Sequence, residues 1–219
     1  MKISTDTIKT LQNFASINNN IRIEAGNKLS TISPGKKVFA RATIPDEFPQ
    51  EFCVYDLNSL LSLLTLGDNP DIEFNDNSLV IRQGNSKTEF FYADEKVIIA
   101  PEKGKNIAVD EHYKFNLSAS DVQTMIKAAG ALAAKSVSIV SKAGKTSILV
   151  SDPKNVTSGS YRISLPASEH DFNVNFEIED LKVLPEDYEV TLSKKKFLHF
   201  KHASRPLEYF IVLHMTSVV

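Results

Sequence analysis

Hydrophobic and polar residues follow two periods along this chain, one typical of helices and one typical of strands. Residues 4–17 carry apolar side chains three and four positions apart, which predicts an amphipathic helix. A leucine-rich stretch at residues 56–65 predicts a second, shorter helix. In the second half, residues 118–132 predict another long helix and residues 179–184 another short one.

Between these helices lie short runs rich in β-branched and aromatic residues, separated by Gly, Pro and Asn turns. Strands are expected at residues 21–24, 28–33, 38–44, 52–55, 71–74, 79–83, 88–92, 112–117, 136–141, 145–151, 159–165, 172–178, 188–193, 197–202 and 207–213. Because runs of strands are broken by two helices in each half, the pattern favours an α+β fold. The helices should pack on one face of mainly antiparallel sheets.

The order of elements repeats, and so do short sequence patterns. Residues 5–11 (Thr-Asp-Thr-Ile-Lys-Thr-Leu) are matched by residues 120–126 (Ser-Asp-Val-Gln-Thr-Met-Ile). Residues 55–60 (Tyr-Asp-Leu-Asn-Ser-Leu) are matched by residues 179–184 (Glu-Asp-Leu-Lys-Val-Leu). A duplicated unit of about 100 residues predicts two similar domains. Duplicated domains of this kind suit rings and scaffolds.

The pattern breaks between the two halves. Residues 93–111 are mostly polar, with the apolar island Val97-Ile98-Ile99-Ala100 among charged residues. We therefore place the first domain at residues 1–93, a connector at 94–111 and the second domain at 112–219. The island either tethers the connector to a core or forms a docking surface. Tethering is favoured, and the two roles are compatible.

Composition limits the class of protein. Hydrophobic residues make up 42% of the 219 positions, as in a globular protein with a core. The single cysteine, Cys53, predicts a small buried side chain in a reducing compartment. No stretch approaches the roughly 20 apolar residues that a membrane span requires, and no apolar run of a signal peptide follows Met1. We expect a cytoplasmic protein with no membrane partner.

Candidate catalytic and metal-binding motifs fail on spacing. Residues 144–146 (Gly-Lys-Thr) resemble the end of a phosphate-binding loop, but Ile139 stands where its first glycine belongs. A hairpin turn is predicted instead. His199 and His202 lie three apart on a predicted strand, so they face opposite sides and cannot share a metal ion.

Helix capping explains the remaining candidate carboxylates. Asp56 and Asp180 begin the two short predicted helices, where a carboxylate accepts free N–H groups, so we expect N-caps rather than a catalytic pair. Ser118 and Asp121 have the spacing of a capping box. We expect no catalytic residue, no metal and no cofactor, and hence no enzyme.

The formal net charge of −2 argues mildly against a tight, free-standing nucleic-acid binder. Lysines nevertheless lie on or beside the predicted helices, while carboxylates concentrate in loops. For any single lysine an ordinary solvated face is the better interpretation. The set as a whole fits a duplex phosphate backbone without reading its sequence. The predicted DNA-facing residues are Lys2, Lys9, Lys127, Lys135 and Lys182.

Three segments carry a resemblance to a known family. They are residues 13–18 (Asn-Phe-Ala-Ser-Ile-Asn), residues 54–58 (Val-Tyr-Asp-Leu-Asn) with the leucines that follow, and residues 97–101 (Val-Ile-Ile-Ala-Pro). Over essentially its full length the chain resembles the sliding clamps of T-even-type bacteriophages, which are DNA polymerase processivity factors. The second half matches mainly in pattern, and its long helix is rich in alanine with one internal lysine.

The resemblance implies a closed homotrimeric ring in which helices line the hole and sheets form the outside. It implies sequence-independent encirclement of duplex DNA, binding to the replicative DNA polymerase, and placement by an ATP-driven clamp loader. It also implies late-transcription factors as partners, in the cytoplasm of a bacterial host. Partner peptides are expected to dock at Val97, Ile98 and Ile99.

Subunit contacts are expected, by the same resemblance, between two strand edges. They would join residues 88–92 of one subunit to residues 160–165 of the next, through Thr88, Phe90, Tyr92, Tyr161, Ile163 and Leu165. A head-to-tail contact of this kind closes into a ring by rotation and covers otherwise exposed edges. The alternative is a duplicated α+β oligomeric scaffold that does not encircle DNA.

Overall fold

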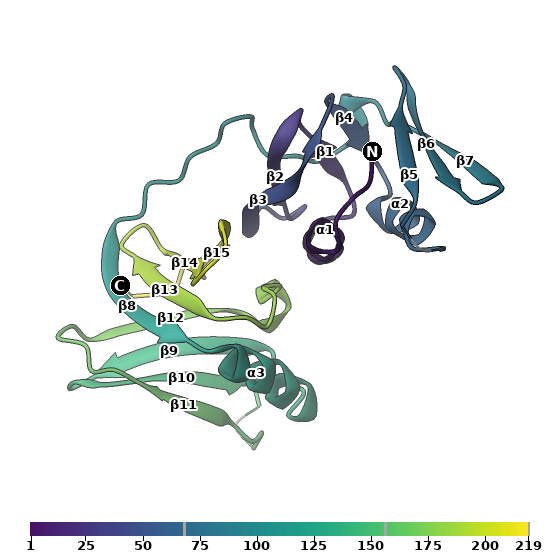
Figure 1. Cartoon of the computed structure of the whole chain (residues 1–219). Coiled ribbons are helices and arrows are strands. Elements are labelled where there is room, and N and C mark those ends of the chain that lie inside the picture. The colour runs from purple at the N-terminus through teal and green to yellow at the C-terminus, as the bar shows by residue number, and fades with distance from the viewer. Residues whose placement is uncertain (68, 156, 219) are drawn as a thin grey trace. The chain divides into compact units, whose positions relative to one another are not determined.

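The chain divides into two compact units, Met1–Lys105 and Asn106–Val219. The computed structural model describes residues 1–67, 69–155 and 157–218 (Figure 1). The division falls inside the predicted connector. Both units combine helices with antiparallel sheets, so the predicted α+β class is confirmed. Among the described residues, no helix is long and apolar enough to cross a membrane.

The first unit carries the predicted elements in the predicted order. They are α1 (Thr5–Ile17), β1 (Ile21–Ile23), β2 (Gly26–Ile32), β3 (Val38–Phe48), β4 (Phe52–Val54), α2 (Leu57–Leu64), β5 (Asp71–Phe74), β6 (Ser78–Gln83), β7 (Ser86–Phe91) and the 3-10 helix η1 (Glu95–Val97). Antiparallel pairing joins β1 to β4, β2 to β3, and β5 to β6 to β7. β3 runs past its predicted end at residue 44, and Phe48 adds a further buried side chain to it.

Helix α1 forms because its caps and its apolar stripe agree. The Ser4 hydroxyl accepts a hydrogen bond from the Thr7 amide at 3.3 Å, and Leu11, Phe14 and Ile17 are buried. These side chains pack on β2, β3 and α2. Burying each of them contributes about 1.5–3 kcal/mol of transfer free energy. The opposite face of α1 is therefore turned to solvent.

The second unit repeats the plan with a larger sheet content. Its elements are β8 (Glu111–Leu117), α3 (Ala119–Ala131), β9 (Ser136–Lys142), β10 (Lys145–Ser151), β11 (Tyr161–Leu165), β12 (Phe172–Glu177), η2 (Ile178–Asp180), β13 (Tyr188–Ser193), β14 (Phe197–His202) and β15 (Leu207–Val212). One sheet has the order β11-β10-β9-β12, and β8, β13, β14 and β15 are neighbours in that order in another. Helix α3 lies on the first of these sheets, against β10 and β11 (Figure 1).

Two local predictions in this unit are confirmed. The Ser118 hydroxyl accepts from the Asp121 amide at 3.1 Å, and the Asp121 carboxylate accepts from the Ser118 amide at 3.2 Å, which is a complete capping box. Ala143 and Gly144 have φ of 50° and 76° and join β9 to β10. Two left-handed residues make the tight turn of a hairpin, not a phosphate-binding loop.

The predicted short helix at residues 179–184 is wrong. Only the three residues of η2 are helical, and Asp180 ends this turn instead of capping it. The run is too short to repay the cost of helix nucleation, and Pro185 disfavours helical backbone at Leu184 before it. Asp56, by contrast, is the N-cap of α2 as predicted, because it accepts from the Ser59 amide at 3.0 Å.

The end of the chain follows the outer side of β12. The His214 amide donates to the Asn175 carbonyl at 2.8 Å, and Val218 and Asn173 exchange two backbone hydrogen bonds. The tail thereby satisfies part of the hydrogen-bonding capacity of this edge. Cys53 is buried in β4, as predicted for the single cysteine of the chain.

We expect Ser118→Ala to lower the free energy of unfolding by about 1 kcal/mol, because it removes the acceptor at the start of α3. Urea denaturation at fixed protein concentration measures the change. Ser120→Ala, two positions along the same helix on an exposed site, is the matched control and should be nearly neutral. Equal effects of the two substitutions would contradict the importance of the cap.

Candidate nucleic-acid and partner interface

The outer face of α1 carries one predicted DNA-facing lysine, and a second precedes the helix. Lys9 is exposed, opposite the buried Leu11 and Phe14, and Lys2 is exposed just before the N-cap. The start of the helix is fixed to β3, because the Ser4 amide and hydroxyl donate to Asp46 Oδ2 at 2.9 and 2.7 Å. The helix therefore holds its lysine in a defined place.

The carboxylate that fixes α1 is stabilised in its charged form. Partial burial raises the pKa of Asp46, but hydrogen bonds from Thr7 and Ser4 lower it, and the hydrogen bonds win. Folding therefore favours the ionised form more strongly than the unfolded chain does.

The outer face of α3 carries Lys127, which is exposed, beside Ile126 with 41% of its surface exposed. The buried face is made by Val122, Met125 and Ala129. Three of the five residues that the sequence nominated for DNA contact therefore lie on or just before long helices: Lys2, Lys9 and Lys127.

The other two lie in the second unit and on neither of its helices. Lys135 is exposed in the loop before β9, and its carbonyl accepts from the Ile178 amide at 3.0 Å. This bond places Lys135 beside η2. Lys182, which follows η2, is half-buried and not on a helix. The expected helical position of Lys182 is therefore wrong.

Four of the five predicted DNA-facing lysines have no ion-pair partner among the described residues. Within residues 1–67, 69–155 and 157–218, no ion pair engages Lys2, Lys9, Lys127 or Lys135. Lys103 of the connector, by contrast, pairs with Glu51 at 2.8 Å. Unpaired ammonium groups on a helical face are available to phosphates.

The connector is tethered to the first unit, as the sequence favoured. The Ala93 amide donates to the Cys53 carbonyl at 2.9 Å, and the Asn18 side chain donates to the Ile99 carbonyl at 2.8 Å. The apolar island is nevertheless only partly covered. Val97 and Ile99 remain 57% and 40% exposed, and Ile98 is half-buried. The predicted docking residues thus form a tethered but accessible ridge.

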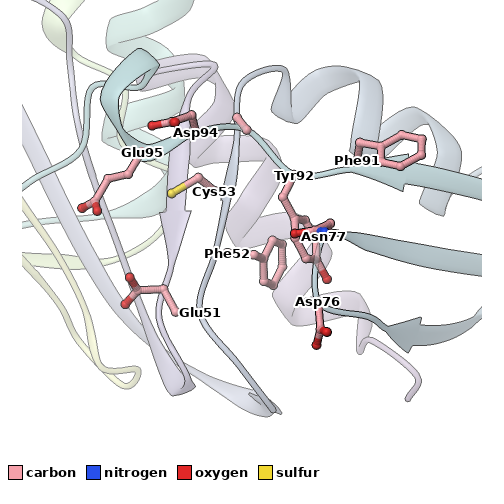
Figure 2. Close-up of a pocket in the computed structure, with 10 residues that line it drawn as sticks. Glu51, Phe52, Cys53, Asp76, Asn77, Phe91, Tyr92, Asp94 and Glu95 are labelled. Carbon is pink, nitrogen blue, oxygen red and sulfur yellow. The ribbon is translucent and has the colours of Figure 1, made fainter.

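A pocket of about 520 Å³ lies where the connector leaves β7 (Figure 2). Phe52 and Tyr92 stack in it with ring centroids 4.8 Å apart. Its carboxylates have partners in the chain, because Glu51 pairs with Lys103 and Glu95 with Arg22, each at 2.8 Å. Each pair joins a residue of the connector to a residue of the first unit outside it, so the pocket is one of the places where the connector is attached to that unit.

The thiol in this pocket is not an activated nucleophile. Burial and the nearby Glu95 carboxylate raise the pKa of Cys53, and the opposing effect of Arg22 is smaller. A nucleophilic cysteine needs the opposite shift. In the second unit, His199 and His202 lie close to different carboxylates, Glu208 at 3.4 Å and Glu186 at 2.7 Å, so they do not converge.

The predicted subunit contacts lie on two strands, β7 and β11, and each is the edge strand of its sheet. In the described chain, β7 pairs only with β6, and β11 pairs only with β10. The inward positions of these strands are half-buried and the alternate ones are exposed. The half-buried set comprises the predicted residues Thr88, Phe90, Tyr161, Ile163 and Leu165, and the predicted Tyr92, just past the end of β7, is half-buried too.

Cross-strand pairing shows why these edges are half-buried. Ile163 pairs with Ile148, which pairs with Ile139, so one apolar row crosses the sheet to its edge. Phe90 pairs with Leu79 in the same way in the first unit. Each apolar row therefore ends on an edge strand, β11 or β7, that pairs with another described strand on one side only.

Sequence reasoning missed the side chains that hold the connector: Asn18, Asn20 and Arg22. Their spacing of two was a signal, since alternate residues of an extended segment face the same side. Their partners lie 73 to 81 positions away, and a contact at that separation leaves no local periodicity to detect.

Comparison with known proteins agrees with this geometry. Residues 4–100 match the family model for the DNA polymerase processivity factor, and residues 114–215 match the model for the gp45 sliding clamp, C terminal. The sliding clamp of Vibrio phage KVP40 is 35% identical over 218 residues, covering 96% of this chain and 98% of that one. The sliding clamp of Escherichia phage RB69 is 32% identical over 200 residues, covering 88% and 87%.

A solved structure shares the fold at low identity. The structure of the C-terminal region of FEN-1 bound to A. fulgidus PCNA superposes with a TM-score of 0.68 at 13% identity, covering 96% of both chains. The two-unit α+β architecture is thus that of a sliding clamp. This chain belongs to the sliding clamp family of DNA polymerase processivity factors, and the resemblance seen in the sequence is confirmed.

We expect Asp46→Asn to destabilise the protein at pH 7 and not at low pH. The folded-state pKa of Asp46 lies below the ordinary 3.8, so its contribution is present above that value and is lost as pH falls through the folded pKa. After allowance for solvent screening, the loss at pH 7 is about 0.5 kcal/mol. Urea unfolding of both proteins at pH 7 and pH 3 measures it, with Asp71→Asn on exposed β5 as the control. A difference that does not change with pH would contradict the charge argument.

Proposed function

We propose that three copies of this chain close into a ring that encircles duplex DNA and tethers the replicative DNA polymerase, without catalysing a reaction. Membership of the sliding clamp family is the observation that carries this proposal. Two features of the molecule support it: unpaired lysines on the outer faces of the long helices, and two sheet edges with unused backbone groups.

The edges support ring closure. A strand edge with unpaired N–H and C=O groups is an attachment site for another strand. Here the apolar rows that end at Phe90 and Ile163 give each edge a hydrophobic face as well. The edge of β7 and the edge of β11 belong to different units, so pairing between them in successive copies is head-to-tail. A head-to-tail contact generates a closed ring when the rotation between successive copies is a whole fraction of a full turn.

We expect Ile163→Asp to weaken the ring, because a carboxylate would replace an apolar contact at the edge. The penalty is about 3 kcal/mol, roughly a hundredfold in the dissociation constant of the contact. Light scattering after size exclusion, over a range of concentrations, separates the 24.3 kDa chain from three copies at about 73 kDa. Ser164→Asp, on the exposed alternate face of the same strand, is the control. A wild-type monomer at every concentration would rule out the ring.

Contact with DNA should be weak and independent of sequence. The lysines meet phosphates rather than base edges, and phosphate contacts carry no sequence information. A net charge of −2 suits a protein that DNA passes through and does not grip. Retention on DNA then depends on closure of the ring.

We expect a Lys9→Ala, Lys127→Ala, Lys182→Ala triple variant to bind linear duplex less well and with a smaller dependence on salt. Each lost phosphate contact lowers the slope of log K against log salt by about 0.9. Fluorescence anisotropy of a labelled duplex at graded salt measures the slope, and light scattering should show an unchanged oligomer. Alanine at the exposed Lys28, Lys142 and Lys154 is the matched control. If the two triple variants behave alike, the DNA-facing assignment is wrong.

Partners are proposed to dock at the ridge formed by Val97, Ile98 and Ile99. An exposed apolar ridge among charged residues fits a partner segment with a few large apolar anchors. The fold relative from A. fulgidus has a peptide region of FEN-1 bound to it in the structure named above. The replicative polymerase, an ATP-driven clamp loader and late-transcription factors are the proposed partners, in the cytoplasm of a bacterial host, as the phage relatives suggest.

A further inference from the structure

We propose that Arg22, with Asn18 and Asn20, is a clasp that holds the connector in the conformation in which Val97 and Ile99 face a partner. The three residues act as positioning residues for binding and do not touch the partner. This inference rests on the proposed docking role of the ridge, and it adds the part of the molecule that prepares that ridge.

Arg22 joins the two ends of the exposed segment. Its side chain is only 9% exposed in β1, and its two terminal nitrogens bond different partners. Nη1 donates to Glu95 Oε1 at 2.8 Å, before the ridge, and Nη2 donates to the Pro101 carbonyl at 2.6 Å, after it. A planar guanidinium can hold two acceptors at once in fixed directions, and an ammonium group is a single point charge.

Asn18 and Asn20 hold the middle of the same segment. Asn18 Nδ2 donates to the Ile99 carbonyl at 2.8 Å, and the Ile99 amide donates to Asn20 Oδ1 at 3.3 Å. Both backbone polar groups of Ile99 are therefore satisfied from one side. Its side chain remains 40% exposed and takes no part in these bonds.

The clasp residues are themselves rigidly placed. Asn18 is buried, accepts from the Asn20 amide at 2.9 Å, and donates a second hydrogen bond to the Ile32 carbonyl at 2.9 Å. Asn20 Nδ2 donates to the Tyr55 carbonyl at 2.6 Å. The Asn18 amide is bonded to three partners and the Asn20 amide to two, so both side chains are held in place and position the connector.

Alternate residues of this segment serve a different neighbour. Asn19, between the two clasp asparagines, donates to Asp56 at 3.0 Å and accepts from the Asn58 amide at 2.9 Å, at the start of α2. Ile21 is buried in the core. The stretch thus presents one side to the connector and the other to α2 and the core, so the clasp rests on a fixed base.

Holding the ridge in place lowers the cost of binding. A free loop would lose conformational entropy when a partner ordered it, and a held loop has already lost it on folding. The exposed Lys103–Glu51 pair adds little to this restraint, since exposed ion pairs contribute little. The buried fork of Arg22 carries most of it.

The test compares Arg22→Gln with Arg82→Gln in the full-length protein. Arg82 also bonds a glutamate, Glu73 at 3.0 Å, but on β6 away from the connector. Hydrogen exchange measured by mass spectrometry follows residues 94–105, and thermal unfolding follows the core. Binding is measured with the purified replicative polymerase of the same phage immobilised on a surface. We expect Arg22→Gln to speed exchange in the connector by about tenfold and to weaken polymerase binding by a similar factor, with α1 unaffected.

Two further variants keep the test decisive if Arg22→Gln folds poorly. Glu95→Gln changes only an exposed side chain of the clasp and should give a smaller effect in the same direction. Arg22→Lys restores charge without the fork and should not restore slow exchange. Connector exchange in Arg22→Gln and Glu95→Gln equal to that in Arg82→Gln would overturn the clasp.

Val97→Asp separates this inference from the docking proposal. If Val97→Asp abolishes polymerase binding while Arg22→Gln speeds exchange without changing affinity, docking stands and the positioning role is overturned. If neither variant changes affinity, the docking proposal fails and the inference fails with it. Loss of binding in Val97→Asp, with weakened binding and faster exchange in Arg22→Gln, supports both.

Discussion

The burial of one apolar helix face against a sheet in each unit is the constraint on which the rest of this clamp depends. Leu11 and Phe14 bind α1 to its sheet, and Val122 and Met125 do the same for α3. Because the helix repeats every 3.6 residues, burying one face determines which side chains the opposite face presents to solvent. The two helices differ in strength, since α3 buries an alanine where α1 buries phenylalanine. The capping box at Ser118 compensates locally by satisfying the first amides of the weaker helix.

The same constraint leaves the sheets with edges that one chain does not cover. On one edge, β12 is partly protected by the tail of its own chain. On the opposite edge of that sheet, β11 has no such cover in the described residues, yet an apolar row leads to it through Ile139, Ile148 and Ile163. Natural proteins blunt unpaired edges with charge, bulges or proline. The apolar row at this edge supports the proposed interface between copies, and in that proposal closure of the ring, not net charge, retains the DNA.

The sequence could predict those features that are determined by residues close together along the chain. Periodicity and turn residues predicted the two long helices, the hairpin at Ala143 and the N-cap at Asp56, because each is decided within a few residues. The predicted helix at residues 179–184 is wrong although these residues resemble residues 55–60, because Pro185 and the short run favour an isolated turn. For the clasp, the spacing of two could show only that its three residues share one side, since Arg22 meets Glu95, 73 positions away, only after the first unit has folded. Contacts between copies are further still from the reach of one sequence.

One residue connects the two proposed surfaces of the first unit. Asn18 is the C-cap of α1, the helix that carries Lys9, and it also holds Ile99 of the connector. The proposed DNA-facing and partner-facing surfaces are therefore built on one continuous stretch, residues 5–22. A coupling of two sites requires an element with two arrangements that both sites bias. In the clasp the Asn18 amide bonds three partners at once, twice through Nδ2 and once through Oδ1, which holds it in one orientation. The link is therefore better understood as a rigid mount that keeps the partner ridge at a fixed place relative to α1 than as a switch that reports DNA to a partner.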